Sequence, residues 1–104
     1  MIIVNSFSLN MVSSFPLDIH AEPLTLDEAK NVARHGIESA VGHEDTAAVF
    51  SSQLGLEIKP NRITVSLKRG DMILVGQYKG PRLPEGTKTL PEGAVIEWLL
   101  VELK

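Results

Sequence analysis

The sequence contains no cysteine among its 104 residues. This absence excludes disulfide bonds, thiol catalysis and cysteine-ligated metal sites, and it is typical of an intracellular protein. The chain also has no apolar run long enough to cross a membrane, and no basic stretch precedes the short apolar run at its N-terminus. We therefore expect a cytoplasmic protein that does not enter a membrane.

Aromatic residues and positive charge are scarce as well. Phe, Trp and Tyr make up 5% of the chain and the formal net charge is −3, which argues against a protein that binds long nucleic acids. The charge is unevenly spread, because residues 59–88 carry seven Lys and Arg against two acidic residues. Such a local basic zone fits a small polyanion in a pocket better than a long duplex. Solvated cations along strand edges are the alternative.

The chain does have enough apolar material for one core. With 43% hydrophobic residues, residues 1–104 are expected to form a single small domain whose core would gain from a partner subunit. Hydrophobic patterning predicts strands over 1–4, 17–21, 61–67, 72–78 and 95–103, and helices over 25–42 and 43–54. Together they predict an α/β domain with a mixed central sheet of about five strands flanked by helices.

Local signals support the two helices. Thr25 and Glu28 have the spacing of a capping box at the start of the first helix. Gly42 is expected to cap its C-terminus, and Gly55 is expected to stop the second helix.

Among the strands, the alternating segment 61–67 is expected to form a hairpin with 72–78. The nearly continuous apolar run 95–103 predicts a strand inside the sheet rather than at its edge. His20 and His35 are expected on the surface.

Residues 5–11 alternate polar and apolar side chains after the first strand. If they stay extended, Ser6, Ser8 and Asn10 share one face and can meet a ligand, while the apolar residues anchor the segment. An ordinary edge segment or a turn is the alternative.

His43 is the most informative single residue. It follows Gly42 at the start of the second helix, where backbone N–H groups favour an anion, and histidine is the residue type that can exchange a proton near neutral pH. Glu44 and Asp45 occupy the same first turn and partly satisfy the helix dipole. We predict a phosphate site at which His43 is the catalytic acid on a phosphodiester; a plain capping role for His43 is the alternative.

Arg82 and Glu85 share a loop bounded by Pro and Gly residues. The arginine fork suits a phosphate, and a nearby carboxylate can orient a hydroxyl or hold the arginine. A local turn salt bridge is the alternative. Arg62, at the start of a predicted strand, is a second phosphate-clamp candidate.

Competing chemistries find little support. The three histidines lack metal-ligand spacing, and the sequence has no HExxH, P-loop, GxGxxG or nucleophile-elbow motif. We expect an enzyme without cofactor or metal that uses acid–base chemistry and cationic clamps.

Four segments, 5–11, 41–46, 61–62 and 76–86, resemble in order and spacing the viral ring nuclease family. These are the type III anti-CRISPR proteins of archaeal viruses, with cellular relatives called ring nuclease 2. The resemblance covers essentially the whole chain. The histidine segment and the Arg–Glu segment are its most specific parts.

The resemblance implies a homodimer that binds cyclic tetra-adenylate across its two-fold axis. Members of this family cleave the ring without metal to linear di-adenylates with 2′,3′-cyclic phosphate, which shuts off type III CRISPR signalling. A viral member would act in the host cytoplasm. The ribose 2′-OH attacks its own phosphate and the family's histidine protonates the 5′-oxygen.

By this resemblance, His43 matches the acid, Glu85 the assisting glutamate and Arg82 its partner. The ligand contacts that it implies, besides Arg82, are Asn5, Ser8, Asn10, Thr46, Arg62 and Gln77. A four-fold ring contains a two-fold axis, so a symmetric dimer can offer two identical half-sites. The loop 80–93 is expected to act as a lid, although Pro84 stiffens it. A protein that only sequesters the ring, or a protein-interaction dimer, is the alternative.

Overall fold

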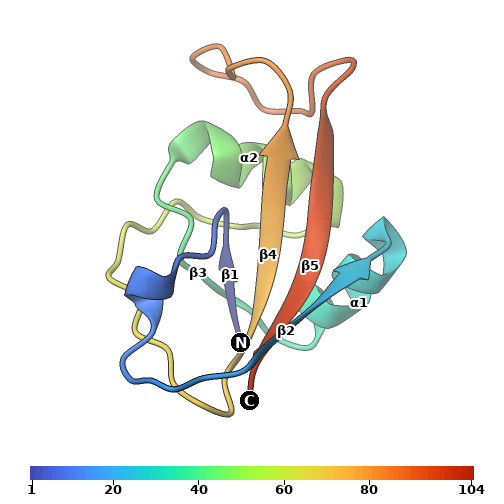
Figure 1. The fold of residues 1–104 in the computed structure, drawn as a ribbon. Coiled ribbons are helices and arrows are strands. Elements are labelled where there is room, and N and C mark those ends of the chain that lie inside the picture. Colours follow the sequence, from blue (N-terminus) through green and yellow to red (C-terminus); the bar gives the residue numbers. More distant parts are fainter.

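The computed structural model describes residues 1–104. The elements are β1 (Ile2–Val4), the 3₁₀ helix η1 (Leu9–Met11), β2 (Ile19–Leu24), α1 (Leu26–Arg34), β3 (Glu38–Ser39), α2 (Glu44–Leu54), β4 (Met72–Lys79) and β5 (Val95–Leu103). Both chain ends lie at one end of the sheet, and the connection between β4 and β5 lies at the other (Figure 1). No helix has the length and apolarity that crossing a membrane requires.

The five strands form one mixed sheet in the order β2-β5-β4-β1-β3. β1 runs parallel to both of its neighbours, β3 and β4. β5 runs antiparallel to β4 and to β2, so it is an interior strand, as its apolar run predicts. The predicted α/β class, with about five strands in a mixed sheet flanked by helices, is confirmed.

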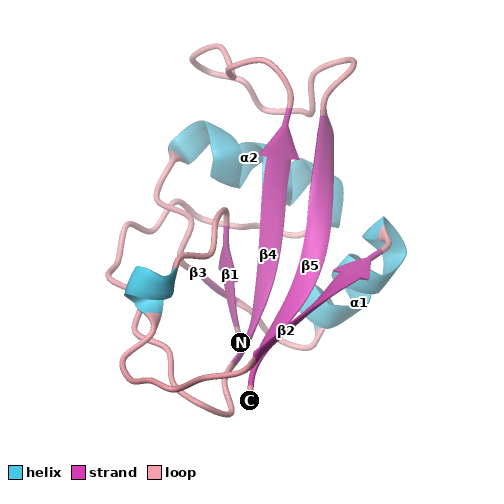
Figure 2. Ribbon diagram, in the orientation of Figure 1, coloured by secondary structure: helices cyan, strands magenta, loops and turns pink.

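The two faces of the sheet are covered differently (Figure 2). Helices α1 and α2 pack on one face, where Phe50 and Leu74 belong to the same buried cluster. Irregular chain covers the other face, where Val12 and Leu67 pack with Ile73. Because alternate residues of a strand point to opposite faces, β4 supplies side chains to both layers.

Helix α1 is shorter than predicted. The capping box at Thr25 and Glu28 forms, with N···O distances of 2.9 and 3.1 Å. The helix nevertheless ends at Arg34 instead of near Gly42, because Gly36 takes a φ of +111°, a left-handed conformation that stops the helix. Apolar residues beyond Gly36 continue the helical spacing, but the chain there forms β3.

The predicted strand 61–67 and its hairpin with β4 are wrong. Both edges of β4 are already occupied, by β5 and by β1, so no partner edge is free. The segment crosses the sheet face, and a single bridge pairs Leu67 with Val12. The backbone groups of residues 62–66 make no hydrogen bond within the chain. The fifth strand is β3.

Residues 5–11 follow the turn alternative rather than the extended one. Ser8 caps η1 and its Oγ accepts from the Asn10 N–H at 3.2 Å. Leu9 is 58% exposed and does not anchor the segment. Strand β2 begins two residues later than predicted, and its His20 is exposed, as is His35 at the end of α1.

Helix α2 is fixed on the sheet by two aromatic rings that meet over a glycine. The ring centroids of Phe50 and Trp98 are 5.0 Å apart. A Cβ on Gly76 of β4 would lie 2.6 Å from Phe50 Cζ and 2.7 Å from Trp98 Cζ3. Only glycine leaves room for both rings in this close-packed layer.

Gly76→Ala is therefore expected to lower the free energy of unfolding by about 1–3 kcal/mol through overpacking. Urea denaturation measures this change. In a Phe50→Leu background the added methyl meets a smaller side chain, so the same substitution should cost less, and the double-mutant cycle gives the coupling. An unchanged stability for Gly76→Ala would show that the rings move aside freely.

Candidate functional site

His43 is the N-cap of α2. Its Nδ1 accepts a hydrogen bond from the Thr46 backbone N–H at 3.3 Å, and the Thr46 hydroxyl lies 3.4 Å from the same nitrogen. The sequence favours this start because Glu44 and Asp45 occupy the first turn, where acidic side chains stabilise the helix dipole. The capping role that the sequence left open is thus confirmed as one role of His43.

This capping bond settles which ring nitrogen can serve a ligand. A backbone N–H can only donate, so Nδ1 of His43 carries no proton while it caps the helix. In the neutral side chain the ring proton is then on Nε2. Because the imidazole is exposed, Nε2 is the nitrogen that can meet a bound molecule.

His43 lies in the wall of an open depression of about 670 Å³. Three separate parts of the chain meet there: the start of α2, the segment after α2 that carries Arg62, and the loop that carries Arg82 and Glu85. The complete lining is Gly42, His43, Glu44, Asp45, Arg62, Arg82, Leu83, Pro84 and Glu85. The structure therefore brings together the predicted acid, the assisting glutamate and both arginine clamps.

The two arginines of this depression have no partner within the chain. Neither Arg62 nor Arg82 makes a hydrogen bond or an ion pair, so the turn salt bridge between Arg82 and Glu85 does not form. Glu44, Asp45 and Glu85 add three carboxylates to the same walls. In this depression the guanidinium groups favour an anion and the carboxylates disfavour one.

Arg62 is held near the helix start by the residues around it. The Asn61 N–H donates to the Val41 carbonyl at 2.7 Å, and Asn61 Nδ2 donates to the Ser39 carbonyl at 2.8 Å. Gly42 presents no side chain, and a Cβ there would lie 3.4 Å from Arg62 Nε. These contacts place the arginine directly beside the residue that precedes His43.

A second depression, of about 390 Å³, adjoins the first and shares His43, Arg82 and Leu83 with it. Its remaining lining is Asn5, Thr46, Tyr78 and Gly80. Two predicted ligand residues, Asn5 and Thr46, thus lie beside the acid. Sequence reasoning missed Tyr78 and Leu83; strand alternation in β4 places Tyr78 on the face that α2 covers, which was the available signal.

Three predicted ligand residues lie outside both depressions. Ser8 and Asn10 belong to η1 and its cap. Gln77 donates to Glu97 on the neighbouring strand at 2.9 Å. Their contact with a ligand stays a prediction. No three His, Asp or Glu side chains are grouped in a way that could hold a metal ion.

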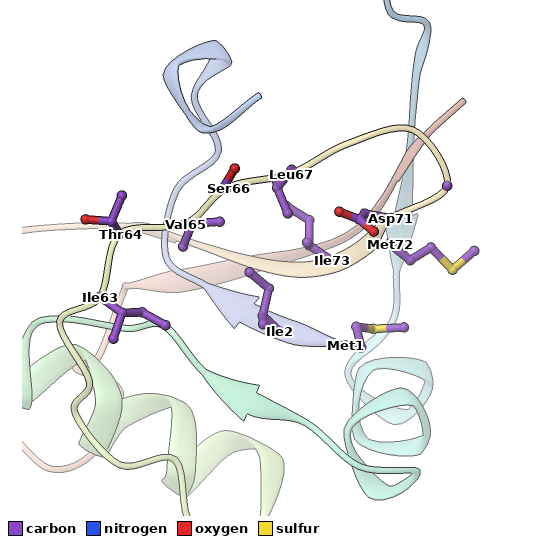
Figure 3. A pocket seen from close by; sticks show the side chains of 11 residues that line it. Met1, Ile2, Ile63, Thr64, Val65, Ser66, Leu67, Asp71, Met72 and Ile73 are labelled. Atoms are coloured by element: carbon purple, nitrogen blue, oxygen red, sulfur yellow. The ribbon is translucent and has the colours of Figure 1, made fainter. Parts of the chain in front are cut away.

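A further depression, of about 540 Å³, is mostly apolar (Figure 3). Ile2 of β1 forms one part of it, and the extended segment with Ile63 and Val65 forms another. Ile63 is 46% exposed and Met1 47%. Ile63 in the lining of this apolar depression directly follows Arg62 of the polar site in the chain.

The comparisons with known proteins place the chain in a family. The model of the family described as STIV B116-like matches residues 1–96. The chain belongs to the STIV B116-like family. A curated relative, protein 26 of Sulfolobus islandicus filamentous virus, is 40% identical over 93 residues, which cover 86% of this chain and 78% of the viral protein.

A solved structure of this family supports the fold. B116 of Sulfolobus turreted icosahedral virus superposes with a TM-score of 0.80 at 24% identity, covering 97% of each chain. Both relatives come from viruses, so the STIV B116-like family is the viral family that the comparisons show.

In this STIV B116-like chain, the capping role of His43 predicts how its variants fold. His43→Asn keeps a strong N-cap acceptor and is expected to unfold with nearly the wild-type free energy, whereas His43→Ala is expected to lose about 0.5–2 kcal/mol. Thermal or urea unfolding distinguishes them. Equal stability of the two variants would mean that the bond to Thr46 contributes nothing.

Proposed function

We propose that this protein is a metal-independent ring nuclease that cleaves cyclic tetra-adenylate. The observation that carries the proposal is the convergence of an exposed imidazole, His43, with two unpaired guanidinium groups, Arg62 and Arg82, on one depression. An arginine can donate two parallel hydrogen bonds to the oxygens of one phosphate, and a histidine beside that phosphate can transfer a proton. The resemblance to viral ring nucleases supplies the substrate, and membership of a viral family is consistent with it.

In the proposed reaction each of these groups has one role. The 2′-oxygen of a ribose forms a bond to its neighbouring phosphorus while the bond from that phosphorus to the 5′-oxygen breaks. His43 acts as the acid in its imidazolium form, in which Nδ1 carries a proton and faces the Thr46 hydroxyl instead of accepting from the Thr46 N–H. Its Nε2–H gives a proton to the 5′-oxygen, which leaves the neutral ring, and the carboxylate of Glu85 accepts the proton of the 2′-OH. Arg62 and Arg82 stabilise the charge that develops on the phosphate. The product ends in a 2′,3′-cyclic phosphate.

A second copy of the chain completes the proposed site. Two half-sites related by a two-fold axis would each cut one of two opposed phosphates and release two equal di-adenylates. A partner could also bring a second set of Asn5, Ser8 and Asn10 to the ring. In a cell, removal of the ring would shut off type III CRISPR signalling, and the host cytoplasm is the proposed location.

The unpaired segment 62–66 is the proposed place of contact between the two copies. Its backbone donors and acceptors have no partner within the chain, and its apolar side chains border the apolar depression of Figure 3. An extended edge of this kind accepts a second extended segment. Since Arg62 begins the segment, a copy seated there would lie beside the phosphate site.

Sequestration of the ring without fast cleavage is the second candidate. It is favoured by the capping bond of His43, which gives that side chain a structural use without catalysis. Three carboxylates in the depression also weaken any preference for a polyanion. Binding and cleavage must therefore be measured separately.

Incubation of the wild-type protein with labelled cyclic tetra-adenylate in EDTA is expected to yield di-adenylates with 2′,3′-cyclic phosphate. His43→Asn keeps the helix cap but lacks the acid, so it is expected to bind the ring and to cleave it about 10²-fold more slowly or worse. Single-turnover assays and equilibrium binding give the two numbers.

The outcomes separate the candidates. Full activity of His43→Asn would remove His43 from the chemistry and leave it as a cap. Tight binding by the wild type with no cleavage would establish sequestration. If the ring does not raise the melting temperature of the protein, both candidates are rejected.

The proposed dimer is tested with Ile63→Glu. A charge placed among the apolar side chains of the contact is expected to raise the dimer dissociation constant at least about tenfold, because it is buried without a partner. Val95→Glu is the matched control, since Val95 is an exposed apolar residue outside this surface, at 56%. Sedimentation equilibrium measures both; a wild-type chain that stays monomeric would remove the dimer from the proposal.

A further inference from the structure

The segment that carries Arg82 and Glu85 is attached to the rest of the protein at both of its ends. At its start, the Tyr78 hydroxyl donates to the Pro81 carbonyl at 2.6 Å. At its end, the Gly86 N–H donates to Oδ1 of Asp45 at 3.3 Å. The two attachments lie immediately outside the residues that face the site, because Pro81 precedes Arg82 and Gly86 follows Glu85.

The two anchoring side chains come from the rigid parts of the fold. Tyr78 belongs to β4, and a Cβ on Gly80, two residues later, would lie 3.0 Å from its hydroxyl, so the chain passes close to that hydroxyl. Asp45 belongs to the first turn of α2, two residues after His43. The loop is therefore attached to the same helix whose N-cap is the proposed acid, His43.

The segment between the anchors has little freedom of its own. Pro81 and Pro84 fix their backbone φ angles. The Thr87 N–H and hydroxyl both donate to the Pro84 carbonyl, which closes a turn around Glu85. Two fixed ends and a stiff middle define where the Arg82 and Glu85 side chains start.

From these contacts we propose that Asp45 and Tyr78 are positioning residues that hold Arg82 and Glu85 opposite His43. This assignment rests on the proposed function for its catalytic consequence, whereas the tethers themselves are features of the free protein. It also gives Asp45 a use in a site that binds phosphate, where a carboxylate is otherwise unfavourable. Glu44 shares the first turn of α2 but makes no hydrogen bond to the loop.

A pair of substitutions separates the tether from the charge. Asp45→Ala and Asp45→Asn both remove the carboxylate, but the asparagine side chain keeps an oxygen that can accept from the Gly86 N–H. Tyr78→Phe keeps the aromatic ring and removes only the donor to Pro81. The three variants therefore differ in the tethers while the packing of β4 and α2 is preserved.

The first readout is backbone order on the ps–ns timescale, measured by ¹⁵N relaxation of residues 82–86 in the free protein. We expect the order parameters to fall in Asp45→Ala and in Tyr78→Phe and to stay near the wild-type values in Asp45→Asn. Unchanged order parameters in the first two variants would overturn the proposal whatever the protein does with a cyclic nucleotide.

The second readout is cleavage of cyclic tetra-adenylate. Asp45→Ala and Tyr78→Phe are expected to lower kcat about 10-fold to 10²-fold by displacing the clamp, and Asp45→Asn is expected to restore most of the loss relative to Asp45→Ala. Because both Asp45 variants remove the same charge, an effect of that charge should change KM by the same factor in both. Equal kcat values for the two Asp45 variants would overturn the positioning role. A fall in order without any wild-type cleavage would support the tethers and reject the proposed function.

Discussion

The contact of Phe50 with Trp98 over Gly76 is the constraint on which the site depends. It seats α2 on the sheet, and thereby fixes where the N-terminus of that helix, with His43, lies relative to β4. β4 also carries Tyr78, two residues beyond Gly76, at the point where the loop with Arg82 begins. Strand β4 thus fixes both where α2 packs on the sheet and where the loop with Arg82 begins. The two parts of the site are therefore positioned by the same strand.

The cap of α2 and the candidate acid are the same side chain. An asparagine or serine would also cap the helix, so capping alone does not require a histidine at this place. The capping bond orients the ring and reserves Nε2 for the depression. The ring that donates a proton carries one on each nitrogen, so it cannot accept the Thr46 N–H at the same time. Capping and proton donation therefore alternate, and the neutral, capping ring is the form that remains after Nε2 has given up its proton.

Sequence reasoning succeeded where the signal was local. The limits of β5, the stop of α2 at Gly55 and the capping box at Thr25 all follow from neighbouring residues. It failed at the segment 61–67, because alternation gives no information on whether a sheet edge is free, and β4 already had two partners. The gathering of Arg62, Arg82 and Glu85 around His43 depends on how helix, loop and sheet pack, so the sequence alone gave candidates without their geometry.

The placement of the chain ends has a practical consequence. Ile2 pairs with Ile73, which pairs in turn with Val101, so the two ends are separated by two strand spacings, about 10 Å. They lie at the end of the sheet opposite the loop between β4 and β5 (Figure 1). A fusion partner or surface linker attached at either end would leave open the depression that His43 lines. A short peptide joining the ends would give a circular permutant, whose new termini could be opened in an exposed loop far from His43.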